Sequence, residues 1–121
     1  MNITEKILAR ASGQTTVSPD DIVFAKIDKV MVHDVSGPGV MKVFDKLQKQ
    51  GIDTSKLHDS SKVWIAEDHF VPSAEKISAE NIVKLSNFSK KYDIKKHFKY
   101  GMGQYGICHT LSHEEALVNP G

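Results

Sequence analysis

The chain has only one cysteine and one tryptophan in 121 residues, and no excess of charge of either sign. One cysteine cannot form an internal disulfide, and it cannot hold an iron–sulfur cluster alone, because such a cluster takes three or four thiolates. A net charge of +1 gives no electrostatic reason to expect nucleic acid as a partner. No apolar run approaches the ~20 residues of a membrane span, and the first residues lack the apolar region of a signal peptide. We therefore expect a cytoplasmic protein that binds neither nucleic acid nor a membrane.

The composition is that of an ordinary globular domain, with 40% hydrophobic and 26% charged residues. A chain of this length can bury roughly two-thirds of its unfolded surface around one core. The sequence shows no internal repeat, low-complexity segment or linker. We expect a single domain, or part of one, over residues 1–121.

Three segments place apolar residues at helical spacing and are expected to form helices: residues 4–12, 39–50 and 78–92. Thr4 is the expected N-cap of the first helix, and Gly13 is its expected end. Ser78 is the expected N-cap of the third helix, with Ile77 and Ile82 as a hydrophobic staple.

Three segments rich in apolar and β-branched residues are predicted strands: residues 22–33 (one bent strand or two short ones), 62–67 and 97–100. The predicted strands alternate with helices of about a dozen residues, which are long enough to return the chain for parallel pairing. The sequence therefore predicts an α/β fold with three layers, α/β/α, around a mainly parallel sheet.

Asp68 and His69 follow directly after the predicted strand 62–67. Open parallel sheets bind ligands outside the carboxyl ends of their strands. A carboxylate beside an imidazole can orient the ring and stabilise its protonated form, so His69 is a candidate acid near neutral pH. The alternative is a polar surface turn that leads into residues 70–72.

His33 and Asp34 also end a predicted strand, and Ser36, Gly37 and Pro38 lead from them into the next helix. Backbone N–H groups at the start of that helix could bind a carboxylate group of a substrate. These five residues are therefore candidate substrate-binding residues. The alternative is that Ser36 or Asp34 only caps the helix.

Residues 101–106 match the pattern G-x-G-x-x-G, but we do not expect a dinucleotide site. Such a site needs a helix that opens at the glycines and an acidic residue ~20 positions later. Residues 107–111 are rich in poor helix formers. We expect the glycines to form a tight backbone path that positions His109.

Cys108, His109 and His113 together suggest metal ligation, but Cys-His-x-x-x-His is not a recognised zinc spacing. A lone cysteine is more often a small buried hydrophobe, so we expect no metal ligands here. Ser112 begins a sequence of the capping-box type and predicts a helical turn that starts at that residue.

Several short motifs follow one another in a fixed order after a start of the type Lys6–Ala9. They are Pro19–Val23, Asp28–Pro38, Asp68–Pro72, Gly106–His109 and Pro120–Gly121. With these motifs in register, the chain resembles the N-terminal part of the aconitase superfamily. Within it, the chain is most similar to the large subunits of 3-isopropylmalate dehydratase and homoaconitase.

Enzymes of this family move a hydroxyl group between adjacent carbons of a 2- or 3-hydroxy acid, with a [4Fe–4S] cluster in the complete enzyme. The resemblance implies that Asp68 and His69 form the acid pair at the leaving hydroxyl and that His109 is an active-site histidine near the cluster. It also implies that residues around Ser36 touch the substrate. A small-subunit partner, a di- or tricarboxylic acid substrate and a role in leucine or related biosynthesis are further implications.

The chain lacks the family's D-S-H-T motif and the three cysteines that hold the cluster, and Cys108 matches a family position that is not a ligand. The resemblance therefore implies an N-terminal portion of a large subunit. Alone, this portion is expected to bind no cluster, to have no turnover, and to self-associate through uncovered apolar surface. The alternative is a stand-alone, non-catalytic α/β module that binds an acidic metabolite or a partner protein.

Overall fold

The computed structural model describes residues 1–103 and 105–118. The described chain separates into two compact units, one built mainly from residues 1–28 and the other from Lys29–Leu117. The larger unit contains the sheet and all the residues proposed for the site.

A parallel sheet forms the centre of the larger unit. Its strands pair in chain order: β1 (Val30–His33), β2 (Val63–Ala66) and β3 (Lys96–Phe98). In this register Val32 lies beside Ile65, and Ile65 lies beside His97. The predicted parallel pairing is confirmed, and β2 is paired along both of its sides.

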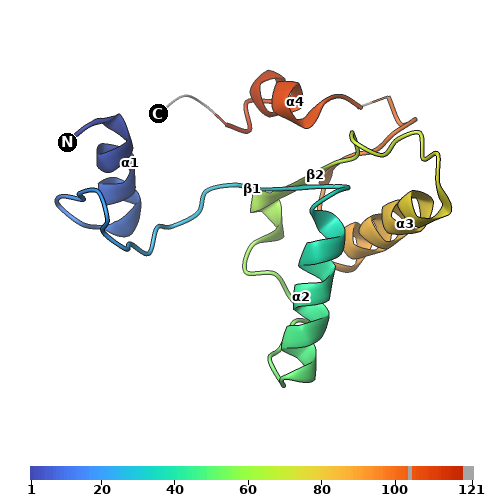
Figure 1. Ribbon diagram of the computed structural model, residues 1–121, viewed down its shortest axis with the longest axis horizontal. Helices are drawn as coiled ribbons and strands as arrows, with labels where there is room; N and C mark the ends of the chain where they lie inside the picture. Colours follow the sequence, from blue (N-terminus) through green and yellow to red (C-terminus); the bar gives the residue numbers. More distant parts are fainter. Residues whose placement is uncertain (104, 119–121) are drawn as a thin grey trace. The chain divides into compact units, whose positions relative to one another are not determined.

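Helices cover both faces of the sheet: α2 (Gly37–Lys49), α3 (Lys76–Lys91) and α4 (Cys108–Glu114), with a short 3₁₀ turn, η1, at Ser60–Lys62. α2 and α3 contact each other on one side of the strands, and α4 lies on the other side (Figure 1). The predicted three-layer α/β/α arrangement is therefore confirmed. None of the described helices is long and apolar enough to cross a membrane.

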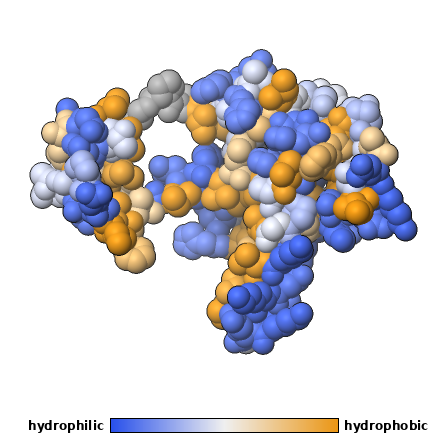
Figure 2. All heavy atoms as spheres, in the orientation of Figure 1, coloured by the Kyte–Doolittle hydropathy of each residue, from blue (hydrophilic) through white to orange (hydrophobic). Residues whose placement is uncertain are grey.

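Each face of the sheet has a core of its own, because successive side chains of a strand point to opposite faces. The core on the side of α2 and α3 contains Val32, Ile65, Leu85, Phe88, Tyr92 and Ile94. The core on the side of α4 contains Trp64, Ala66, Phe98, Cys108, Leu111 and Leu117. In Figure 2, α2 has one apolar flank and one hydrophilic flank, as a helix that covers a sheet should.

α1 (Ile3–Ser12) is the helix of the smaller unit. The Asn2 side chain accepts the Glu5 N–H (2.9 Å), and the Glu5 carboxylate accepts the Asn2 N–H (2.7 Å). The expected N-cap at Thr4 is wrong, because this reciprocal capping box starts the helix two residues earlier. Gly13 ends the helix as predicted, with a left-handed φ of 71°.

The predicted strand over residues 22–33 is reduced to its last four residues, Val30–His33. Ile22 and Phe24 are 93% and 94% exposed, and no described strand pairs with the segment that carries them. Strand propensity alone does not form a strand, since the backbone groups need a neighbouring strand with which to bond.

The third helix starts earlier than predicted. α3 begins at Lys76 with Glu75 as its N-cap, so Ser78 lies inside the first turn and does not cap the helix. Ile77 is also inside the helix and 69% exposed, so the predicted staple with Ile82 is wrong. Residues 75–77 contain neither glycine nor proline, which allows the first turn to form there.

A helix forms at residues 108–114, where the poor helix formers predicted none. Cys108 and Leu111 of α4 are buried in the core on that side of the sheet. Burial of this face outweighs the low intrinsic propensity. Ser112 therefore lies inside α4, where its hydroxyl donates to the His109 carbonyl (2.7 Å), and the turn expected to start at Ser112 is wrong.

Substitution by alanine should have opposite effects on stability at two glycines in the first turn of α2. A Cβ on Gly37 would lie 2.7 Å from Leu85 Cδ1, whereas nothing lies within 4 Å of a Cβ on Gly39. Leu85 is 1% exposed, so it has little space to move. Overpacking costs about 1–3 kcal/mol, and alanine gains about 0.5–1 kcal/mol over glycine inside a helix.

We expect Gly39→Ala to raise the midpoint of urea unfolding and Gly37→Ala to lower it. An equal rise in both variants would contradict the close packing of Leu85 against α2.

Candidate functional site

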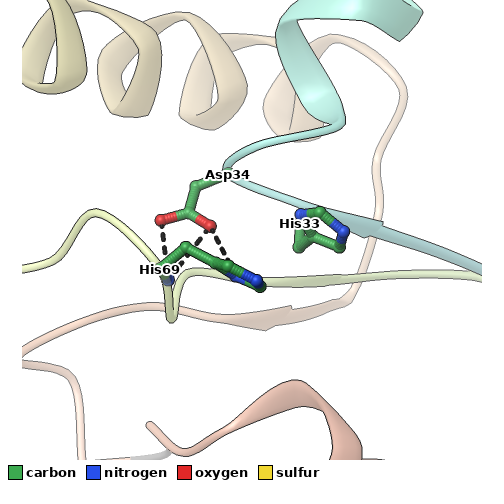
Figure 3. Close-up of side chains that lie close together, drawn as sticks. All are labelled: His33, Asp34 and His69. Carbon is green, nitrogen blue, oxygen red and sulfur yellow. Dashed lines mark hydrogen bonds and ion pairs between the residues drawn. The ribbon is translucent and has the colours of Figure 1, made fainter.

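The carboxyl ends of β1 and β2 bring His33, Asp34 and His69 side by side (Figure 3). His33 is the last residue of β1, Asp34 begins the turn into α2, and His69 lies in the segment that follows β2. Two of the sequence motifs therefore meet at one edge of the sheet. This is the edge at which parallel sheets bind ligands.

Asp34 holds the backbone of the neighbouring segment. Its side chain is 1% exposed, and its oxygens accept the backbone N–H groups of His69 (3.2 and 3.1 Å) and Phe70 (2.6 Å). Oδ1 also lies 3.5 Å from Nδ1 of the His69 ring. A buried carboxylate needs such donors to offset its lost hydration. Both oxygens of Asp34 are thus engaged within the chain, and they fix the position of His69.

Asp68 joins His69 to the start of α4. Oδ1 lies 2.6 Å from His69 Nδ1, and Oδ2 accepts the Cys108 backbone N–H (2.7 Å). The Asp68 side chain is 4% exposed. Burial alone would raise the pKa of this carboxyl, but hydrogen bonds from Cys108 and His69 hold the pKa below its usual value. Asp68 is therefore an ionised acceptor at neutral pH.

The ring of His69 is 43% exposed, with its Nδ1 edge turned to the two carboxylates of Asp34 and Asp68. A hydrogen bond to the Asp68 carboxylate places a proton on Nδ1. Nε2 is then the nitrogen that can exchange a proton with a ligand. The residue lines a cleft together with Phe70, Pro72 and the start of α3. The arrangement can therefore position an imidazole for proton transfer at a bound molecule.

His33 stacks on His69, with ring centroids 4.7 Å apart and an angle of 23° between the rings. Nδ1 of His33 accepts the backbone N–H groups of Val35 and Ser36, each at 3.2 Å. The Ser36 hydroxyl also accepts the His33 N–H (3.1 Å). Ser36 thus stabilises the turn after β1, and its side chain does not cap α2. Nε2 is the nitrogen of His33 that remains for a ligand.

The first turn of α2 offers few donors to a ligand. Pro38 has no N–H, and the Val40 N–H already donates to the Ser36 carbonyl (3.1 Å). This leaves the N–H groups of Gly37 and Gly39 as the donors that the turn can offer to a carboxylate group. Gly37 is buried, so a ligand reaches this turn only from its outer side.

His109 lies in the first turn of α4, with an exposed side chain. Its neighbour Cys108 donates its backbone N–H to the Asp68 carboxylate (2.7 Å). Gly101 and Gly103 both have a left-handed φ of 77°, which glycine adopts in tight turns. His109 thus directly follows the residue that bonds to Asp68, and no hydrogen bond joins its side chain to Asp68 or His69 among the described residues.

The polar atoms of His33, Asp34 and His69 lie within 4.8 Å of one another, a spacing that could suit a metal ion. The hydrogen bonds argue against that use. Both Asp34 oxygens and Nδ1 of His33 already accept backbone N–H groups. The two rings are nearly parallel, so their in-plane lone pairs run side by side and do not converge on one point.

A second carboxylate–imidazole pair was missed in the sequence. Glu67 Oε1 lies 2.8 Å from His97 Nε2, and both side chains are only 4% exposed. Glu67 Oε2 accepts the Tyr100 N–H (3.2 Å). The available signal was a charged residue directly after the apolar run of β2, together with a histidine in a predicted strand.

Over its whole length the chain is similar to curated proteins named 3-isopropylmalate dehydratase large subunit. It is 40% identical over 121 residues to the protein of Caldicellulosiruptor saccharolyticus and 40% identical over 121 residues to that of Aquifex aeolicus. It is 42% identical over 119 residues to the protein of Hydrogenobaculum sp.. The predicted family resemblance is confirmed.

The chain spans 26–27% of the length of these large subunits and matches their N-terminal part. The regions of similarity cover 98–100% of the chain. No family model matches the chain.

The ionised Asp68 should make the protein less stable in acid. Because its folded pKa is lowered, its contribution to stability is complete above the unfolded pKa of about 3.9 and is lost as the pH falls through the folded value. We expect the midpoint of urea unfolding to be higher in the wild type than in Asp68→Asn. The difference between the two midpoints should be constant above about pH 5 and smaller below about pH 4.

Asp45→Asn, at an exposed position of α2, is the matched control and should differ little from the wild type at any pH. A difference between wild type and Asp68→Asn that does not change with pH would contradict the lowered pKa.

The Cys108 thiol should be unreactive in the folded protein. It is 0% exposed, and burial raises its pKa to about 11, with a further contribution from the Asp68 carboxylate. The thiolate is the reactive form, and it would be about one part in a thousand at pH 8. We expect Ellman's reagent to detect almost no thiol in native buffer and one thiol per chain in urea. Fast native reaction would mean that α4 does not pack on the sheet.

Proposed function

We propose that the chain is the N-terminal part of the large subunit of a hydro-lyase that isomerises a 2- or 3-hydroxy acid of the isopropylmalate or homocitrate type. The reaction would be dehydration followed by rehydration at the adjacent carbon, in cytoplasmic leucine or related biosynthesis. The observation that carries the proposal is the Asp68–His69 pair, with its ring on a cleft. The name shared by the related large subunits supports the reaction class.

Loss of a hydroxyl group from carbon needs a proton donor, because hydroxide is a poor leaving group. With Nδ1 of His69 held at the Asp68 carboxylate, Nε2 of the protonated ring gives its proton to the hydroxyl oxygen, which leaves as water when the C–O bond breaks. A base in another part of the enzyme takes the proton from the adjacent carbon, and the electron pair of that C–H bond forms the C=C bond. In rehydration the neutral Nε2 takes a proton from the water that adds to the neighbouring carbon, and the same base returns its proton to the other carbon. Asp68 keeps the ring in one orientation through both steps, and Asp34 holds the backbone beneath it.

The substrate acid is proposed to lie against the turn between β1 and α2. His33 faces it with Nε2, since its Nδ1 is engaged with the backbone. Ser36, Gly37 and Pro38 form the rest of this side, and the N–H of the exposed Gly39, in the same turn, is the donor for a carboxylate group. Asp34 is assigned to positioning. His109 is proposed as a further active-site histidine, because it directly follows the residue that bonds to Asp68.

The residues of this chain do not fit a [4Fe–4S] cluster. Cys108 is its single cysteine, and the raised pKa of the buried thiol keeps it protonated. A cluster takes several thiolates. In the proposed enzyme the cluster is held by other residues of the large subunit, and the 121 residues alone bind no cluster and have no turnover.

We also assign the complete enzyme a small subunit as its partner. The 93% and 94% exposure of Ile22 and Phe24 supports a need for further protein to cover apolar side chains. Alone, the 121-residue piece is expected to self-associate through such side chains.

Loss of the acid pair should reduce turnover in the complete enzyme. We expect His69→Gln and Asp68→Asn in the full-length large subunit, assembled with its small subunit, to lower kcat for hydration of the unsaturated acid by about 10²–10⁴. His58→Gln, at an exposed loop position, is the matched control and should keep wild-type kcat.

Cluster content should be measured in each preparation by iron analysis, so that loss of turnover is not loss of cofactor. Wild-type kcat in fully loaded His69→Gln enzyme would exclude His69 as the proton donor.

A further inference from the structure

We propose that Glu67 and His97 form a buried positioning pair that fixes the Asp68 carboxylate, and through it the His69 ring. This role rests on the proposed function of His69 as proton donor. The pair does not touch the cleft beside His69 but lies between β2 and β3. It acts on the site through Tyr100, to which Glu67 bonds, and through Cys108, to which the next residue, Asp68, bonds.

Both oxygens of Glu67 are engaged in the interior. Oε1 bonds to His97 Nε2 (2.8 Å), and Oε2 accepts the Tyr100 N–H (3.2 Å). The backbone N–H of Glu67 also donates to the Phe98 carbonyl (3.0 Å). These three bonds fix the point at which the chain leaves β3.

Glu67 and Asp68 are consecutive residues, and they bind the two ends of one segment. Glu67 accepts the N–H of Tyr100 at its start, and Asp68 accepts the N–H of Cys108 at its end. The segment contains three glycines, and glycine loses more conformational freedom on ordering than any other residue. Charged acceptors at both ends offset that loss and hold the Cys108 N–H where Asp68 can accept it.

The Cys108 N–H matters because it orients Asp68. One Asp68 oxygen accepts this N–H, and the other oxygen is thereby directed at His69 Nδ1. If the Cys108 N–H shifts, the Asp68 carboxylate rotates and the His69 ring loses its fixed orientation. Glu67 thus acts on His69 from a distance, without contact with the proposed substrate.

The chemistry of the pair favours a positioning role over simple packing. Nδ1 of His97 is buried and has no hydrogen-bond partner among the described residues. Burying a charged carboxylate and an incompletely satisfied imidazole is costly, and apolar side chains of similar volume often stabilise such a position as well or better. What apolar side chains cannot do is accept the Tyr100 N–H.

The first test is a double-mutant cycle in the full-length enzyme with its small subunit. We expect Glu67→Gln to lower kcat by about 10-fold to 100-fold, with KM changed less than about 2-fold and a normal iron content. In the Asp68→Asn background the same substitution should cause no further loss, because both act through one carboxylate. Multiplied losses would overturn the proposal, as would no loss in Glu67→Gln when His69→Gln does lose turnover.

The second test does not depend on turnover, so it separates this proposal from the proposed function. The full-length protein is labelled with ¹⁵N in histidine, and the ring nitrogens of His69 are followed by NMR. We expect Glu67→Gln to change the share of neutral His69 rings that carry the proton on Nδ1. Glu114→Gln, an exposed carboxylate of α4, should leave that share unchanged. An unchanged share in Glu67→Gln would overturn the positioning role.

His97→Gln provides a second approach to the pair, for use if Glu67→Gln does not fold. It removes the imidazole but still allows Glu67 to accept the Tyr100 N–H. We therefore expect the share of neutral His69 rings with the proton on Nδ1 to change in the same direction as in Glu67→Gln, but by less. If His69→Gln proves active while Glu67→Gln still alters the His69 ring, the coupling stands and the hydro-lyase assignment of His69 fails.

Discussion

The structure depends on one constraint, the pairing of β2 with a parallel neighbour on each side. This pairing takes up the backbone groups of β2 and buries Trp64, Ile65 and Ala66 between two cores. The strand therefore cannot shift or rotate without loss of both cores. The chain therefore leaves the edge of the sheet at a fixed point, and the three residues that follow β2 directly form or support the candidate site.

These three residues, Glu67, Asp68 and His69, have different surroundings. Glu67 faces β3 and binds the chain there, Asp68 binds the start of α4, and His69 faces the cleft. The buried Asp34, from the neighbouring strand end, holds the backbone of the third. Buried carboxylates at the ends of rigid elements thus hold His69 in place, and its ring remains partly exposed. A preorganised site has this arrangement.

Much of this was predictable, because it depends on local pattern. Apolar periodicity predicted α1, α2 and α3, and the alternation of strands with helices predicted the parallel sheet. The position of Asp68 and His69 after a strand predicted where they would lie. The remainder depends on contacts between distant residues. Nothing near Asp34 in the sequence shows that it binds the backbone at His69 and Phe70, 35 and 36 residues away. The same holds for α4, which forms because its apolar face is buried.

The strand-end placement of the site also limits how the sequence can change in length. Side chains of an extended segment alternate between two faces, so one residue added between Ala66 and Glu67 would exchange the faces of the residues that follow. The carboxylate that binds β3 would then point towards α4, and the imidazole would turn away from the cleft. The site therefore accepts substitutions far more readily than insertions or deletions, and its spacing from β2 is as much a part of the site as the identity of its residues.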